Sequence, residues 1–172
     1  DISALLVATA KARADADGAS NVTFIEADAQ TFGFGAGSFD AVVSRLGVMF
    51  FDDPAAAFAN LQWAARPEAQ LAFVAWRSGD ENPFMTAAER AAAPIIEGLP
   101  IRGDDSPGQF GFASGRRVKG VLEASGWTSV KARPVDIACS LPVAQLQTYV
   151  TRMGPYGRVR TTLDRTFHFA NA

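Results

Sequence analysis

Residues 39–44 read FDAVVS, and this nearly continuous apolar run is the stretch that decides the fold class. Such a run is typical of a parallel strand covered on both faces of its sheet. Ten residues later, Asp53 and Pro54 form the start of a helix that we expect to reach about Ala65, because Asp is a preferred N-cap and Pro is tolerated in the first turn. The connection from strand to helix is too long for a hairpin, which favours a crossover.

Further elements are expected on both sides of this unit. Residues 21–27 (NVTFIEA) and 70–76 (QLAFVAW) have the β-branched and aromatic content of strands. Ser3 is expected to cap a helix over residues 4–16. We expect that helix to bury one stripe of side chains, made of Leu5, Leu6, Thr9, Ala12 and Ala16. Alternating helices and strands favour an α/β fold with a mostly parallel sheet and flanking helices.

The second half of the chain has a different character. Residues 79–113 are rich in Pro and Gly, with one helical stretch near 84–97, and we expect them to form an inserted lid over the carboxyl edge of the sheet. A helix at 114–125 and a strand-like stretch at 127–140 follow, and then a helix at 143–152. The expected organisation is therefore a partial core (1–78), a lid (79–113), a late helix and strand (114–140) and a helical C-terminal segment, possibly also lid (141–172).

Composition limits the functional classes. The chain has 172 residues, 48% of them hydrophobic, and a formal net charge of −2, which argues against a disordered chain and a nucleic-acid-binding surface. Its apolar runs are too short to span a bilayer. Cys139 is the single cysteine, which fits a reducing cytoplasm, and we expect it to be a small buried hydrophobe. His168 is the single histidine, so we expect no metal site built on histidines and a surface position for His168.

Polar residues follow the expected strands where each one ends. Asp28 comes directly after the strand at 22–27, Ser44 ends the next one, and Asp1 precedes the first helix. Open α/β sheets bind ligands at the carboxyl ends of their strands, so these three positions are candidates for a binding site. Each also has a plain structural explanation: a solvated terminal Asp, a turn Asp, and a residue leading from strand to loop.

Four stretches taken together resemble a known family. They are DIS at 1–3, NVTFIEADAQ at 21–30, SFDAVVSRLGVMFFDDP at 38–54 and RPEAQLAFVAW at 66–76. In this order they resemble the class I S-adenosylmethionine-dependent methyltransferases, of the small-molecule type related to ubiquinone and menaquinone biosynthesis. The resemblance is dense over residues 1–77 and looser over 104–135. It implies a Rossmann-like sheet and S-adenosylmethionine as the cofactor.

The resemblance also implies roles for five residues at the cofactor. Asp1 is expected to hold the ribose hydroxyls, and Ile2 to pack on the face of the adenine. Asp28 and Ala29 match the pair that reads the edge of the adenine. Ser44 matches the residue that lines the methionine end of the site.

The acceptor side is predicted less sharply. Arg45 and Leu46 are expected to face the substrate, a small molecule. Phe84 and Phe110 fall in the expected lid, where they either line an apolar substrate pocket or pack the lid against the body. No residue is assigned as a catalytic base, and the oligomeric state is left open.

Departures from the family pattern give a second functional hypothesis. The family's glycine-rich first loop has no counterpart after Asp1, so the resemblance implies a chain that enters at the end of the second strand and leaves before the last. The string at Gly33–Gly37 precedes a strand and is interpreted as a flexible connection. The family's usual Pro-Gly-Gly turn is replaced by Pro67-Glu68-Ala69. The two main hypotheses are methyl transfer, incomplete in this chain, and a non-catalytic methyltransferase-like fragment or scaffold. A third, a nicotinamide-dependent oxidoreductase on a related sheet, lacks residues for hydride transfer.

Overall fold

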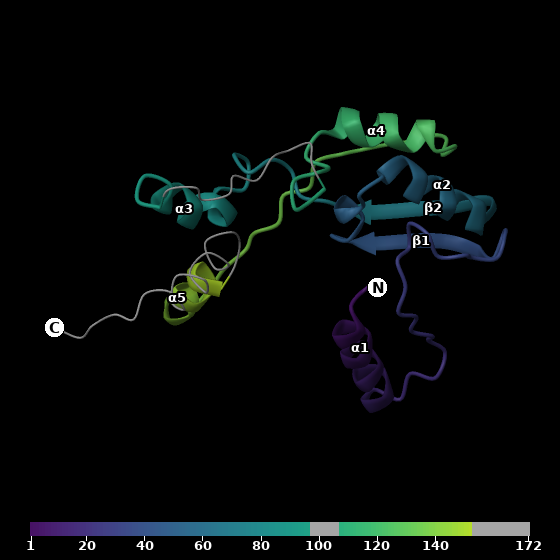
Figure 1. The fold of residues 1–172 in the computed structure, drawn as a ribbon, viewed down its shortest axis with the longest axis horizontal. Helices are drawn as coiled ribbons and strands as arrows, with labels where there is room; N and C mark the ends of the chain where they lie inside the picture. The colour runs from purple at the N-terminus through teal and green to yellow at the C-terminus, as the bar shows by residue number, and fades with distance from the viewer. Residues whose placement is uncertain (97–106, 153–172) are drawn as a thin grey trace.

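The computed structural model describes residues 1–96 and 107–152 (Figure 1). Its described residues contain one two-stranded parallel sheet, formed by β1 (Phe39–Arg45) and β2 (Ala65–Val74). The short 3₁₀ helix η1 (Val48–Phe50) and the helix α2 (Pro54–Ala64) connect the two strands. The predicted strand, crossover helix and parallel strand are therefore confirmed.

The helix α2 begins where the sequence predicts. The carboxylate of Asp53 accepts a hydrogen bond from the Ala56 backbone N–H at 3.0 Å, and Pro54 occupies the first turn. Ala57, Phe58 and Leu61 form a buried face with Ala64, because they repeat at helical spacing.

The strand β2 differs from its expected range of 70–76. It starts at Ala65, pairs there with Phe39, and then bulges so that the next rung joins Ala41 to Gln70. Within the bulge Glu68 adopts φ +67°, a left-handed conformation that suits glycine better than a residue with a Cβ atom. The turn that the sequence predicts to be made without glycine is thus made by a glutamate in a glycine-like conformation.

The core lies on one face of the sheet, between the strands, α2 and α4 (Gly115–Ala124). Ser114 caps α4, which confirms the predicted helix at 114–125 to within a residue at each end. Phe58 is fully buried, and its ring centroid lies 5.7–5.9 Å from the centroids of the rings of Phe51, Phe73 and Phe112.

Two hydrogen bonds join the later chain to α2. The indole N–H of Trp127 donates to the Phe58 carbonyl at 3.0 Å, and the hydroxyl of Ser125 donates to the Ala55 carbonyl at 2.9 Å. These bonds satisfy polar groups in a largely apolar environment, and they fix α4 against α2.

The opposite face of the sheet is bare among the described residues. Val43 is 79% exposed and Val74 is 49% exposed. The prediction that the FDAVVS strand is covered on both faces is therefore wrong for the described residues: Val42 and Ser44 turn towards α2, while Ala41, Val43 and Arg45 face outward.

The helix α1 (Ala4–Ala16) has the predicted bounds, and Ser3 caps it by accepting from the Leu6 N–H at 3.3 Å. The predicted buried stripe is wrong, since no residue of α1 is buried and Leu5 remains 76% exposed. Figure 1 shows the reason: α1 lies beyond the edge of β1 and away from the core.

Residues 22–27 are not a strand, which corrects the prediction for this segment. They make a single rung with the start of the chain. The Asp1 amino group donates to the Ile25 carbonyl at 3.2 Å, and the Ala27 N–H donates to the Asp1 carbonyl at 2.9 Å. This pair of bonds around Glu26 has the geometry of a parallel ladder, but one rung is too short to make a strand.

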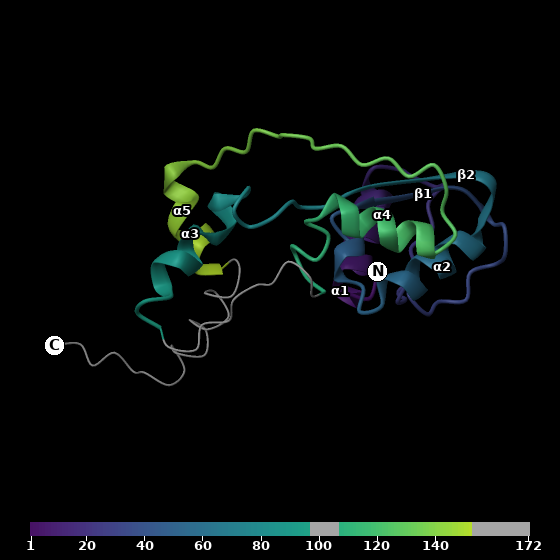
Figure 2. The same ribbon diagram turned by 90° about the horizontal axis from the view of Figure 1, so that it is seen from above.

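The helices α3 (Pro83–Ala92) and α5 (Val143–Arg152) lie apart from the core, beyond the carboxyl ends of both strands (Figures 1 and 2). α5 has its predicted bounds, whereas α3 ends five residues before the predicted end at 97. The predicted strand at 127–140 is wrong, because the chain there runs without a ladder partner. Cys139 lies in this segment and is exposed, so the prediction of a buried cysteine is wrong as well.

Candidate functional site

The carboxyl ends of β1 and β2 lie side by side, as the parallel pairing requires. The last rung joins Arg45 to Val74, and the Leu46 N–H donates to the Val74 carbonyl at 3.0 Å. Leu46 has φ +60°, a strained conformation for a residue with a branched side chain, held by this bond. Ser44 is half-buried, and its hydroxyl lies so close to Gly47 that a Cβ atom there would be 3.3 Å away.

Asp1 and Ile2 sit at the start of α1. The carboxylate of Asp1 accepts from the Ser3 N–H at 2.8 Å, which leaves the second carboxylate oxygen without a hydrogen bond to the described residues. The next residue, Ile2, has an apolar side chain that is 74% exposed.

Asp28 is half-buried and is held by Gln30. One carboxylate oxygen accepts from the Gln30 backbone N–H at 2.9 Å, and the Gln30 side-chain amide donates to both oxygens at 3.1 and 3.3 Å. Ala29 follows with its carbonyl bound by the Asn60 side chain at 3.0 Å. The carboxylate therefore has a fixed orientation before any ligand arrives.

The same loop is anchored to α2. The Gln30 side-chain oxygen accepts from the Asp53 N–H at 3.1 Å, and the amide of Asn60 also donates to the Phe32 carbonyl at 3.0 Å. The sequence reasoning did not single out Gln30 or Asn60. The signal for Asn60 was available, because it is a polar residue three positions after the buried Ala57 and four before the buried Ala64.

The structure thus brings the predicted residues together in two groups. The Asp1 carbonyl accepts from the N–H of Ala27, the residue before Asp28, which places the backbones of the first group close together. Ser44, Arg45 and Leu46 form the second group, at the end of β1. Among the described residues no hydrogen bond joins the groups directly; the bond from Gln30 to Asp53 ties the first group to the helix that follows the second.

Phe84 and Phe110 lie in different environments. Phe84 is 44% exposed, and its ring meets Trp76 edge to face at 6.2 Å. Phe110 is only 2% exposed and lies over Gly79, where an added Cβ would come within 3.3 Å of its ring. Phe84 lies in the first turn of α3, and Phe110 packs on the chain that leads into this helix. Whether they meet a substrate stays a prediction.

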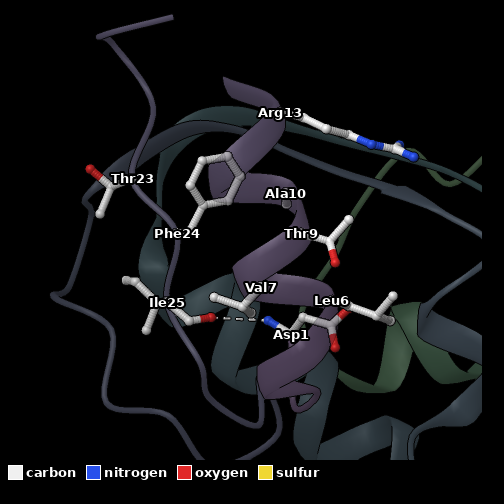
Figure 3. Close-up of a pocket in the computed structure, with 9 residues that line it drawn as sticks. All are labelled: Asp1, Leu6, Val7, Thr9, Ala10, Arg13, Thr23, Phe24 and Ile25. Atoms are coloured by element: carbon white, nitrogen blue, oxygen red, sulfur yellow. Dashed lines mark hydrogen bonds between the residues drawn. The ribbon is translucent and has the colours of Figure 1, made fainter. Parts of the chain in front are cut away.

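An open groove of about 630 Å³ lies between α1 and residues 23–25 (Figure 3). Its walls are mainly apolar, and its lining residues are Asp1, Leu6, Val7, Thr9, Ala10, Arg13, Thr23, Phe24 and Ile25. Of the predicted site residues, only Asp1 lines it. The groove is the uncovered apolar side of α1 and the following segment, and it is separate from the carboxyl ends of β1 and β2.

Other candidates can be placed or set aside. Asp53 caps α2, so capping accounts for it, as expected; among the described residues no group of three His, Cys, Asp or Glu side chains could hold a metal. Within the same residues, no helix is both long and apolar enough to cross a membrane. The loop pair Asp104 and Asp105, and His168, lie outside the described residues.

A comparison with protein-family models gives a match for the N-terminal part of the chain. A family model described as a methyltransferase domain matches residues 1–73. The match supports a class I S-adenosylmethionine-dependent methyltransferase, and the two parallel strands with their flanking helices are compatible with a Rossmann-like α/β fold. It contains all seven predicted residues from Asp1 to Leu46 and ends one residue before the end of β2. A comparison with curated proteins found no match.

Proposed function

We propose that this protein transfers a methyl group from S-adenosylmethionine to a small-molecule acceptor. One observation carries the proposal: the backbone of Asp1 pairs with Ile25 and Ala27, and the oriented carboxylate of Asp28 follows directly after them, inside the stretch that matches the methyltransferase domain. Two carboxylates beside an exposed apolar side chain suit an adenosine, which presents hydroxyl and amine donors around a flat ring.

Each residue of this group has a proposed task. The free oxygen of Asp1 accepts from the ribose hydroxyls, while its other oxygen is held by Ser3. Ile2 packs on the face of the adenine. Asp28 accepts from the exocyclic amine, and the Ala29 N–H donates to a ring nitrogen. Burial of these partners on binding makes each bond costly to lose.

The acceptor is proposed to bind beyond the carboxyl ends of β1 and β2. Ser44 lines the methionine end of the cofactor, and Arg45 and Leu46 face the acceptor. Residues 79–113, which contain Phe84 and Phe110, are proposed as a lid, together with the helical segment from 141. The position of α3 and α5 beyond these strand ends supports this, and the aromatic content favours an apolar or aromatic acceptor (Figure 2).

The chemistry places modest demands on the protein. S-adenosylmethionine supplies an already activated methyl group on its sulfonium. The protein then has to align the acceptor in line with that methyl and exclude water. Residues at the end of β1 hold the acceptor, and the lid reduces access of water. No side chain among the described residues is assigned as a general base.

The single cysteine fits a cytoplasmic location.

Formation of S-adenosylhomocysteine tests the proposal. The protein is incubated with S-adenosylmethionine and a panel of small phenols, quinols and carboxylates, and the product is quantified. We expect turnover with at least one acceptor and its loss in Asp28→Ala. The control is Asp40→Ala, which removes an exposed carboxylate that pairs with Arg66 away from the site.

A second function is favoured by the exposed apolar surface around α1. Leu5, Leu6 and Ile25 are 47–76% exposed, and contiguous apolar surface of this kind marks sites of interaction. A non-catalytic, methyltransferase-like scaffold would bury this surface against a partner. Absence of both turnover and S-adenosylhomocysteine binding would favour this alternative over methyl transfer.

A further inference from the structure

We propose that Gln30 is a positioning residue for the cofactor, acting through Asp28. The inference rests on the proposed function, since it assigns a task within the same site. It starts from an unusual concentration of bonds on one side chain. The two side-chain atoms of the Gln30 amide, together with its backbone N–H, make four hydrogen bonds, three to Asp28 and one from Asp53.

The bonds to Asp28 fix the carboxylate in two ways. The Gln30 backbone N–H, at 2.9 Å, closes a turn on one oxygen, and the side-chain amide spans both oxygens. A carboxylate has about four acceptor directions, two on each oxygen. Oδ1 of Asp28 already accepts two bonds and Oδ2 accepts one, so Oδ2 still has capacity for a ligand donor. Gln30 therefore restrains Asp28 while leaving it able to accept from an exocyclic amine.

The fourth bond ties this arrangement to a rigid element. The Gln30 oxygen accepts from the N–H of Asp53, the residue that caps α2, and α2 is packed into the core through Phe58. Asp28 is therefore anchored to the core through Gln30 and α2, and not only to its own loop. A site held by a packed helix loses less conformational freedom on binding than a site on a free loop.

Asn60 provides a useful comparison. It binds the carbonyls of Ala29 and Phe32 and so holds the same loop, but it makes no bond to Asp28. Removing Asn60 should loosen the loop, whereas removing the Gln30 side chain should leave the carboxylate held by the Gln30 backbone N–H alone. A merely structural role for Gln30 would make the two variants behave alike.

The test is calorimetric titration of S-adenosylhomocysteine into the wild-type chain and into Gln30→Ala, Asn60→Ala and Gln30→Glu. The control is Gln70→Ala, an exposed glutamine on β2. We expect Gln30→Ala to weaken binding about five- to tenfold with little change in the thermal unfolding midpoint, as loss of one charge-assisted interaction predicts. Gln70→Ala should match the wild type.

The Gln30→Glu variant gives a signature that a structural role would not. A glutamate still accepts from Asp53 but faces Asp28 as a like charge, so binding should be weak near neutral pH. It should recover towards the wild-type affinity at acidic pH, where a protonated glutamate can donate again. The wild-type affinity should not show this recovery.

The outcomes separate the two proposals. Binding by the wild type with unchanged affinity in Gln30→Ala, or with equal losses in Gln30→Ala and Asn60→Ala, would overturn the role of Gln30 and leave the proposed function standing. Absence of binding by the wild type would overturn the cofactor assignment and the role of Gln30 together.

Discussion

The two parts of the region that matches a methyltransferase domain differ in how many side chains they bury. In the part from β1 onward, Phe58 of α2 is completely buried against β2 and the aromatic residues before α4. The part from Asp1 to Ile25 has well-formed local structure, including a capped helix, and yet buries no residue of α1. Local signals are sufficient to form and end a helix, but burial needs a partner surface, and α1 has none among the described residues.

The largest expected effect lies in the packed part. Phe58→Ala removes a fully buried ring that contacts Phe51, Phe73 and Phe112, so we expect a loss of about 3–5 kcal/mol in the free energy of unfolding. Urea unfolding followed by tryptophan fluorescence measures it.

The matched substitution in the other part is Leu5→Ala, since Leu5 is 76% exposed. It should change the same free energy by less than about 0.5 kcal/mol. A loss of several kcal/mol for Leu5→Ala would show that α1 is packed in solution, and the contrast between the two parts would fail.

Hydrogen bonds in the core give the next effect. Ser125→Ala removes a hydroxyl whose single hydrogen is shared between the carbonyls of Ala55 and Val121, at 2.9 and 2.7 Å, and with it a polar link between α4 and α2. We expect a loss of about 1–2 kcal/mol in urea unfolding. No measurable loss would mean that water replaces the hydroxyl and that the junction of α2 and α4 is looser than described.

The helices α1 and α2 are capped by the same kind of hydrogen bond, although they lie in the two different parts. Asp53→Ala removes the cap of α2 and should cost about 1 kcal/mol of global stability. Ser3→Ala removes the cap of α1, and its cost should appear as local fraying in amide hydrogen exchange of α1, with the global transition almost unchanged. Equal global losses for both caps would mean that α1 unfolds together with the core.

The smallest expected effect is a gain. Glu68 holds φ +67° in the β2 bulge, so Glu68→Gly should relieve strain and raise the free energy of unfolding by about 0.5–1 kcal/mol. The gain is reduced by the greater freedom of glycine in the unfolded chain. Destabilisation would show that Glu68 makes an interaction that outweighs its strain.

The sequence predicted elements well wherever the signal was local. Asp53 and Pro54 set the start of α2, and Ser3 and Ser114 set the starts of α1 and α4, because a cap is a contact between near neighbours in the chain. The strands at 22–27 and 127–140 were wrong for the complementary reason: strand-like composition makes a strand only when another segment provides a ladder.

The candidate site was predictable only in part. The position of Ser44 near the end of β1 could be read from the sequence, whereas Asp28 follows a segment that is not a strand. The family resemblance supplied the roles proposed for both residues. The network of Gln30, Asp53 and Asn60 joins residues 23–31 positions apart, so no local pattern reveals it. The backbone pairing of Asp1 with Ile25 and Ala27 could not be predicted from a local pattern either. It forms because the chain after α1 runs back alongside residue 1.

In the proposed function, S-adenosylmethionine binds beside Asp28 and at the carboxyl end of β1, and not in the groove between α1 and residues 23–25. Amide hydrogen exchange of the protein with and without S-adenosylhomocysteine distinguishes the two locations. We expect slower exchange on binding at residues 28–32 and 44–49, with Leu6 to Arg13 unchanged. Protection confined to α1 and residues 23–25, or no protection anywhere at saturating ligand, would show that the proposed location is wrong.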